Sequence, residues 1–217
     1  YGGPSTNAPF LNRLASRSLV FQRAYATAPW TLPSTASMFT GRLPSELSTG
    51  WNTPLDHARP TLAEALSAAG YATAGFVANS RYCSRETGLG RGFDHYEDYP
   101  FHPANFVLST AIGQRLFTSD FAPLVGICDD PARVSAEDVN QLFSDWLSQR
   151  PKRPFFAFLN YFDVHHPYLA PAPFDRHAPQ DAEERKLFLH WWWVHKAHVE
   201  DAELATLRAA YLDCLRY

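Results

Sequence analysis

Residues 28–42 carry hydroxyl groups at the point where a helix is expected to begin. Pro33 suits the first turn of a helix that ends at Gly41, which places Thr31 and Ser34 near the helix N-terminus. Unpaired backbone N–H groups and the positive end of the helix dipole make this a favourable place for an anionic ester or a covalent intermediate. Thr and Ser are also common N-caps, and residue type and spacing alone favour that structural interpretation.

A second candidate follows an apolar run. Residues 155–162 predict a buried strand, and His165, His166 and Pro167 come soon after it. An imidazole on the loop that leaves a buried strand lies at the carboxyl edge of the sheet, where α/β enzymes bind ligands. Without other context this loop favours a structural role, and His166 is expected to pack within it.

Two further clusters are weaker candidates for metal sites. His190, His195 and His198 surround three tryptophans, but no acidic or sulfur ligand joins them at a recognised spacing. The tryptophans are better explained as a buried or lid-like patch. Asp129 and Asp130 precede a proline, which favours an exposed turn.

The elements that must position these residues alternate between helix and strand. A capping box opens a helix at Thr61, and residues 71–77 follow as a strand. A second capping box opens the helix before the apolar strand 155–162, and residues 181–217 are helical again. This order predicts that residues 1–217 are part of one doubly wound α/β domain, with a parallel sheet covered by helices on both faces.

Composition excludes several classes of protein. With 46% hydrophobic and 19% charged residues, the chain can bury a globular core. The net charge of -3, without a basic stripe, argues against nucleic-acid binding, and no stretch reaches the roughly 20 apolar residues of a membrane span. Cys83, Cys128 and Cys214 have no metal-binding spacing and favour unpaired thiols over a disulfide. None of these features predicts a compartment.

A wider pattern extends over nearly the whole chain in five segments. These are residues 1–26, with YG, NRLA, F and AYA; 30–41, WTLPSTASMFTG; 61–76, TLAEALSAAGYATAGF; 91–94, RGFD; and 163–168, DVHHPY. In order and spacing they resemble the sulfatase family of the alkaline phosphatase superfamily. The resemblance implies the α/β fold of that superfamily and the hydrolysis of sulfate, phosphate or phosphonate esters.

The resemblance also implies a role for Thr31. In the family motif this position holds a Cys or Ser that is oxidised to formylglycine, and Thr is not a substrate for that oxidation. Relatives in the superfamily use an unmodified Thr bound to a metal ion, among them nucleotide pyrophosphatase-like phosphodiesterases and lipoteichoic-acid synthase-like transferases. Thr31 is therefore expected to be both nucleophile and metal ligand, with His165 helping the leaving oxygen to depart.

Three positions depart from the family pattern. Thr35 stands where the family has Arg or His to orient the nucleophile. Ala78 and Ser80 stand where the family has a Lys and a His that hold the oxyanion of the substrate. Ser34 and Asn79 then become the candidates for substrate binding, Asn79 through one hydrogen bond.

The resemblance implies a divalent metal ion, Ca²⁺ or Mg²⁺, with Zn²⁺ or Mn²⁺ as alternatives. The family's acidic ligands lie in segments before and after this chain, which is therefore expected to be an internal piece, incomplete at both ends and inactive alone. For the intact protein the first hypothesis is a metal-dependent hydrolase of small-molecule, glycan or lipid esters. The alternatives are a transferase of phosphoryl-linked groups with the same fold and a non-catalytic sulfatase-like binding protein.

Overall fold

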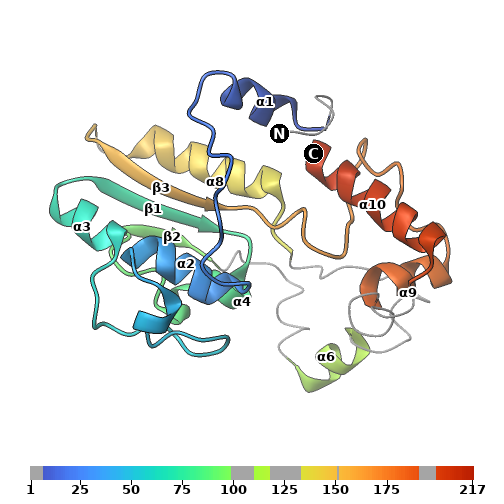
Figure 1. Cartoon of the computed structure of the whole chain (residues 1–217), viewed down its shortest axis with the longest axis horizontal. Helices are drawn as coiled ribbons and strands as arrows, with labels where there is room; N and C mark the ends of the chain where they lie inside the picture. Colours follow the sequence, from blue (N-terminus) through green and yellow to red (C-terminus); the bar gives the residue numbers. More distant parts are fainter. Residues whose placement is uncertain (1–6, 99–109, 118–132, 151, 191–198) are drawn as a thin grey trace. The chain divides into compact units, whose positions relative to one another are not determined.

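Two compact units make up the chain in a computed structural model that describes residues 7–98, 110–117, 133–150, 152–190 and 199–217 (Figure 1). The sheet unit comprises Gln22–Pro100 and Val134–Phe162. The helical unit comprises Tyr1–Phe21, Phe101–Arg133 and Asp163–Tyr217. Each unit has hydrophobic core residues of its own.

Three parallel strands form the centre of the sheet unit. They are β1 (Ala72–Val77), β2 (His95–Glu97) and β3 (Phe155–Asn160), arranged in the order β2-β1-β3. Ala74 of β1 pairs with His95 of β2, and Ala72 pairs with Phe155 of β3. Every residue of β1 is buried, because this strand has a neighbour on each side and helices on both faces. The parallel sheet confirms the predicted fold class.

Helices cover both faces of the sheet, as predicted (Figure 1). Successive side chains of a strand point to opposite faces, so Phe76 and Val77 of β1 belong to different clusters. Val77 clusters with residues of α2 (Thr31–Thr40) and α3 (Leu62–Ala68): Leu32, Ala36, Phe39 and Ala63. Phe76 clusters with residues of α8 (Ala136–Gln149): Val139, Leu142, Phe143 and Trp146.

The predicted helix ends agree with the structure because each depends on a local signal. The Thr61 hydroxyl accepts a hydrogen bond from the Glu64 N–H at 3.1 Å, and the Glu64 carboxylate accepts one from the Thr61 N–H at 2.7 Å. Ser135 and Asp138 form the same capping box at the start of α8. Gly41 ends α2 in the left-handed conformation, with φ 64°.

The prediction for the last strand was wrong in its length and burial. β3 ends at Asn160 rather than residue 162, and its residues are partly exposed, with Phe155 at 38%. In the described part of the chain β3 pairs with β1 alone, so its other edge has no neighbouring strand. An apolar run thus identified the strand but not its position in the sheet.

The helical unit contains α1 (Pro9–Ala15), α6 (Ala111–Phe117), α9 (Ala182–His190) and α10 (Asp201–Arg216). Its core joins α9 and α10 through Leu187, Phe188, Leu207 and Ala210. Short helices η1 (Pro44–Glu46), α4 (Ser80–Cys83) and η2 (Arg85–Thr87) belong to the sheet unit. None of the helices in the described ranges is long and apolar enough to cross a membrane.

The buried face of α10 differs from the face that residue spacing predicts. Leu204, Leu207, Tyr211 and Leu215 have helical spacing, but only Leu207 among them is buried. The buried face also includes Asp213, which is 2% exposed. Its carboxylate forms an ion pair with Arg216 at 2.8 Å and a hydrogen bond with His177 Nδ1 at 2.7 Å. These charge-assisted contacts offset the desolvation of the carboxylate, which explains why a charged residue occupies a core position.

Candidate functional site

Thr31 is the first residue of α2 rather than its N-cap. The N-cap is Trp30, whose side chain makes no capping hydrogen bond. The backbone N–H of Ser34 donates a hydrogen bond to the Trp30 carbonyl oxygen at 3.1 Å. Proline at position 33 has no N–H to offer, and the first turn holds no acidic residue. The N-terminus of α2 therefore keeps its positive dipole end without a neutralising carboxylate in its first turn.

The start of α2 lies beside the segment that follows the central strand. Tyr82 of α4 contacts Trp30 edge to face, with ring centroids 5.5 Å apart. Helix α4 begins three residues after β1 ends, so Thr31 lies near the carboxyl edge of the parallel sheet. Ligands of open α/β sheets bind at this edge.

Asn79 caps α4 with its side chain. Its Oδ1 accepts a hydrogen bond from the Tyr82 N–H at 3.2 Å, and its own N–H donates to Asn160 Oδ1 at 2.9 Å. The residue is 5% exposed. The capping bond uses Oδ1, which leaves Nδ2 as the group with which Asn79 could donate to a substrate.

The departures at positions 35 and 80 have different structural settings. Thr35 is buried and hydrogen-bonds the thiol of Cys83. Burial raises the pKa of Cys83 to about 11, and the bond from Thr35 partly opposes that shift. Thr35 therefore packs inward as a neutral residue instead of presenting a charge. Ser80 is half-buried as the first residue of α4.

The loop that carries His165 is held by an arginine. The Arg133 guanidinium donates hydrogen bonds to the backbone carbonyls of Pro167 at 3.0 Å, His165 at 2.9 Å and Asp163 at 3.3 Å. Three carbonyls bound to one rigid planar group define the path of the loop. Sequence analysis missed Arg133, because a single Arg before a capping box has no signal that links it to residues 163–167.

The two neighbouring histidines are both biased toward the neutral form. Burial lowers the pKa of His165; a hydrogen bond to the His166 carbonyl opposes this shift, and the positive charge of Arg133 adds to it. Burial also lowers the pKa of His166 to about 4, with further lowering by His165 and Arg133. The rings of the two histidines lie 4.2 Å apart between centroids.

His165 Nδ1 lies 2.9 Å from the His166 carbonyl oxygen. A carbonyl oxygen can only accept, so Nδ1 carries the hydrogen. In the neutral ring Nε2 then has a lone pair, and only the imidazolium form can donate a proton from Nε2. This protonation requirement limits what His165 can do as an acid.

The candidate residues divide between the units. Thr31, Ser34 and Asn79 belong to the sheet unit, and His165 belongs to the helical unit. Within the sheet unit, the Trp30–Tyr82 contact places the starts of α2 and α4 next to each other.

The described residues do not by themselves build a metal site. Nowhere in the described ranges do three or more His, Cys, Asp or Glu side chains gather as a divalent ion would require. Thr31 supplies one neutral hydroxyl oxygen, which fits a single position in the shell of a hard cation but not a complete set of ligands.

Several weaker candidates lie outside the described residues. These are Cys128, Asp129, Asp130, residues 191–193, His195 and His198. Cys83 is a buried free thiol and Cys214 is also buried. Because Cys128 lies outside the described residues, the expectation of three unpaired cysteines stays a prediction.

Comparison with known proteins identifies the family. The family model described as Sulfatase matches residues 1–217. The chain belongs to the sulfatase family. A member in Bacteroides thetaiotaomicron, delta 4,5-hexuronate-2-O-sulfatase, is 28% identical over 71% of this chain and 28% of its own length. The multifunctional alkaline phosphatase superfamily protein PehA of Trinickia caryophylli is 28% identical over 98% of this chain and 46% of its own length.

A solved structure supports the fold of this sulfatase-family chain. The phosphonate monoester hydrolase of Agrobacterium radiobacter matches 99% of the chain with a TM-score of 0.65 and 20% identity. That match covers 52% of the hydrolase. The chain thus spans about half or less of each of these relatives, and the agreement in structure concerns the fold.

Proposed function

We propose that this chain carries part of the active site of an ester hydrolase, which acts on sulfate or on phosphate-type esters with Thr31 as its nucleophile. The observation that carries the proposal is the position of Thr31 at the start of α2. There its hydroxyl is next to a helix N-terminus without a side-chain cap or a first-turn acid, near the carboxyl edge of a parallel sheet.

In the proposed reaction the Thr31 hydroxyl oxygen attacks the sulfur or phosphorus atom of the ester. A bond forms to Thr31, and the bond to the leaving alcohol oxygen breaks. The hydroxyl proton passes to solvent, and the leaving oxygen takes a proton from the His165 imidazolium, which recovers one from solvent. Water then cleaves the enzyme ester and releases the inorganic or phosphonic acid. The N–H groups at the start of α2 stabilise the anionic oxygens in both steps.

Ser34 and Asn79 are proposed to bind the ester, and His165 to protonate the leaving oxygen. Because Nδ1 of His165 donates to the His166 carbonyl, the proton must come from Nε2 of the imidazolium. The lowered pKa of His165 makes that form a stronger acid but a less abundant one at neutral pH. The role of His165 therefore matters most for leaving groups that need a proton.

A divalent cation is part of the proposal as a cofactor. Thr31 would supply one ligand, and the other ligands would come from beyond the described residues. Such an ion lowers the pKa of a bound hydroxyl. Support comes from family membership and from the share of the relatives that the chain spans: we propose that its 217 residues are part of a larger catalytic domain.

Replacing Thr31 tests the proposal directly. In the full-length protein, Thr31→Ala is expected to lower kcat on the order of 10⁴-fold or more, because the bond-forming oxygen is lost. Turnover is measured on a panel of sulfate, phosphate and phosphonate monoesters, and mass spectrometry looks for an ester on Thr31. Thr40→Ala is the matched control, because Thr40 is the last residue of α2 and bonds the Ala36 carbonyl at 2.8 Å.

Activity retained by Thr31→Ala would overturn the assignment of the nucleophile. A wild-type protein that turns over no ester of the panel, with metal ions supplied, would favour the non-catalytic alternative. Transfer of the group to an added alcohol in preference to water would favour the transferase alternative.

A further inference from the structure

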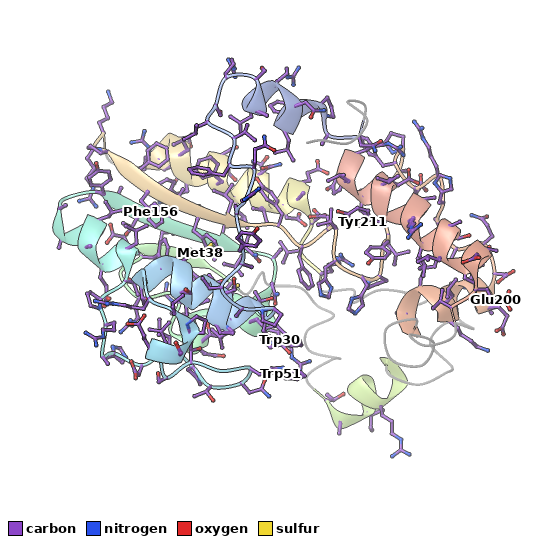
Figure 2. All side chains as sticks on the ribbon, viewed as in Figure 1. Trp30, Met38, Trp51, Phe156, Glu200 and Tyr211 are labelled. Carbon is purple, nitrogen blue, oxygen red and sulfur yellow. The ribbon has the colours of Figure 1, made fainter. Side chains whose placement is uncertain are left out.

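Three aromatic rings gather at the start of α2. Trp30 is the N-cap residue, Trp51 lies in the loop between η1 and α3, and Tyr82 is on α4. The rings of Trp30 and Trp51 are 4.0 Å apart between centroids, at 40°, and Figure 2 shows these two side chains next to each other. We call this group the Trp30–Trp51–Tyr82 cluster.

Trp51 is held in one orientation although much of its surface is open. Its Nε1–H donates to the Tyr82 hydroxyl oxygen at 3.0 Å, and its ring leans on Trp30. It is nevertheless 54% exposed. Other large apolar side chains of the sheet unit are also exposed, so exposure alone does not distinguish it. What distinguishes Trp51 is an open ring that a hydrogen bond fixes to Tyr82 and a ring contact fixes to Trp30, the residue before Thr31.

The cluster also has hydrogen-bond donors that are not satisfied by contacts within the cluster. Trp30 Nε1 is buried and has no hydrogen-bond acceptor among the described residues. Tyr82 accepts a bond from Trp51, and its own hydroxyl hydrogen remains to be donated. A buried donor without a protein acceptor is unusual in a core, and Trp30 Nε1 is therefore a group that an acceptor outside the described residues could bond.

We propose that the Trp30–Trp51–Tyr82 cluster is a binding subsite for an aryl or pyranose ring in the leaving group of the ester, and that Trp51 determines specificity for such a ring. Trp30 directly precedes Thr31, so the cluster adjoins the residue that carries the proposed nucleophile. Aromatic surfaces stack on aryl rings and on the C–H faces of pyranose rings, whereas a flexible alkyl chain gains less from stacking. This inference rests on the proposed function of Thr31.

The test compares three leaving groups on the same oxyanion in the full-length protein: 4-nitrophenyl, a hexopyranose and n-butyl. Trp51→Ala is expected to lower kcat/KM about tenfold for a ring substrate and to leave the butyl ester unchanged, because stacking contributes only where there is a ring. Trp51→Phe should restore most of the loss. Leu43→Ala is the control, because Leu43 is a 57% exposed apolar residue in the same unit.

Comparing the losses of kcat/KM on the 4-nitrophenyl and hexopyranose esters shows whether the subsite prefers an aryl or a pyranose leaving group. Equal losses on all three esters, or no loss on either ring, would overturn the subsite. Thermal unfolding of each variant shows whether a loss reflects misfolding, and Trp51→Phe keeps the test valid if the Ala variant does not fold.

The subsite and the hydrolase can fail separately. If the wild-type protein turns over no ester, binding of phenol and of methyl glucopyranoside is followed through the indole N–H signal of Trp51, which Trp51→Phe identifies. Ring binding without turnover would contradict the hydrolase proposal and support the subsite. Absence of both binding and ring preference would sink the subsite.

Discussion

At the scale of single residues, the two histidines of the 163–167 loop carry the clearest pH dependence. Burial, His165 and Arg133 together lower the pKa of His166 from 6.5 to about 4. The unfolded chain takes up a proton on His166 near pH 6.5, while the folded chain does so only near pH 4. The stabilising contribution of neutral His166 to the free energy of unfolding is therefore fully present above about pH 6.5, and it is lost as the pH falls toward 4.

His166→Gln should make stability less dependent on pH within this window, because the variant removes the group that binds a proton in only one state. The measurement is the urea midpoint between pH 8 and pH 4 for both proteins. His57→Gln is the control, because it replaces a histidine at an exposed position. Carboxylates that titrate in the same pH range affect all three proteins alike. A pH dependence unchanged by His166→Gln would contradict the prediction.

At the scale of elements, the pairing of β1 with β2 depends on a glycine. A Cβ on Gly75 would overlap the Tyr96 ring, and Gly75 and Tyr96 are paired in register. The Tyr96 hydroxyl donates to the Cys83 carbonyl at 2.6 Å, which limits how far the ring can move away. β1 therefore requires glycine at this position because of a close approach.

Gly75→Ala should destabilise the protein by about 1–3 kcal/mol through overpacking of a well-packed core. The free energy of unfolding of the variant and of the wild-type protein is measured by denaturant titration. Gly50→Ala is the matched control, because a Cβ there meets Thr53 atoms only at ordinary van der Waals distances of 3.6 and 3.8 Å. Equal stability of the two variants would show that the Tyr96 ring relaxes more easily than its contacts indicate.

At the scale of the whole molecule, catalysis is proposed to need a divalent ion that the described residues do not hold by themselves. Treating the full-length protein with a chelator should abolish turnover, and Ca²⁺ or Mg²⁺ should restore it. The same ion should raise the melting temperature, because a ligand that binds only the folded state stabilises it. Full turnover in protein shown to be free of metal would contradict the cofactor proposal.

The sequence alone determined the features that depend on neighbours along the chain. The capping boxes at Thr61 and Ser135, the end of α2 at Gly41 and the helix-then-strand order of α3 with β1 and of α8 with β3 were predicted correctly, whereas strand β2 was not predicted. The family segments also identified Thr31 as the position to consider. Local signals suffice here because caps, turns and periodicity involve residues only a few positions apart.

Only the tertiary structure decided which distant residues meet. It joined Arg133 to the carbonyls of residues 163–167 and Trp51 to Trp30 and Tyr82, and it paired Thr35 with Cys83. It also placed β3 at an edge of the sheet that the described residues form, and Asp213 in a core. No sequence pattern specifies these contacts, because each depends on the path of the chain between its partners and on the direction in which the fold points each side chain.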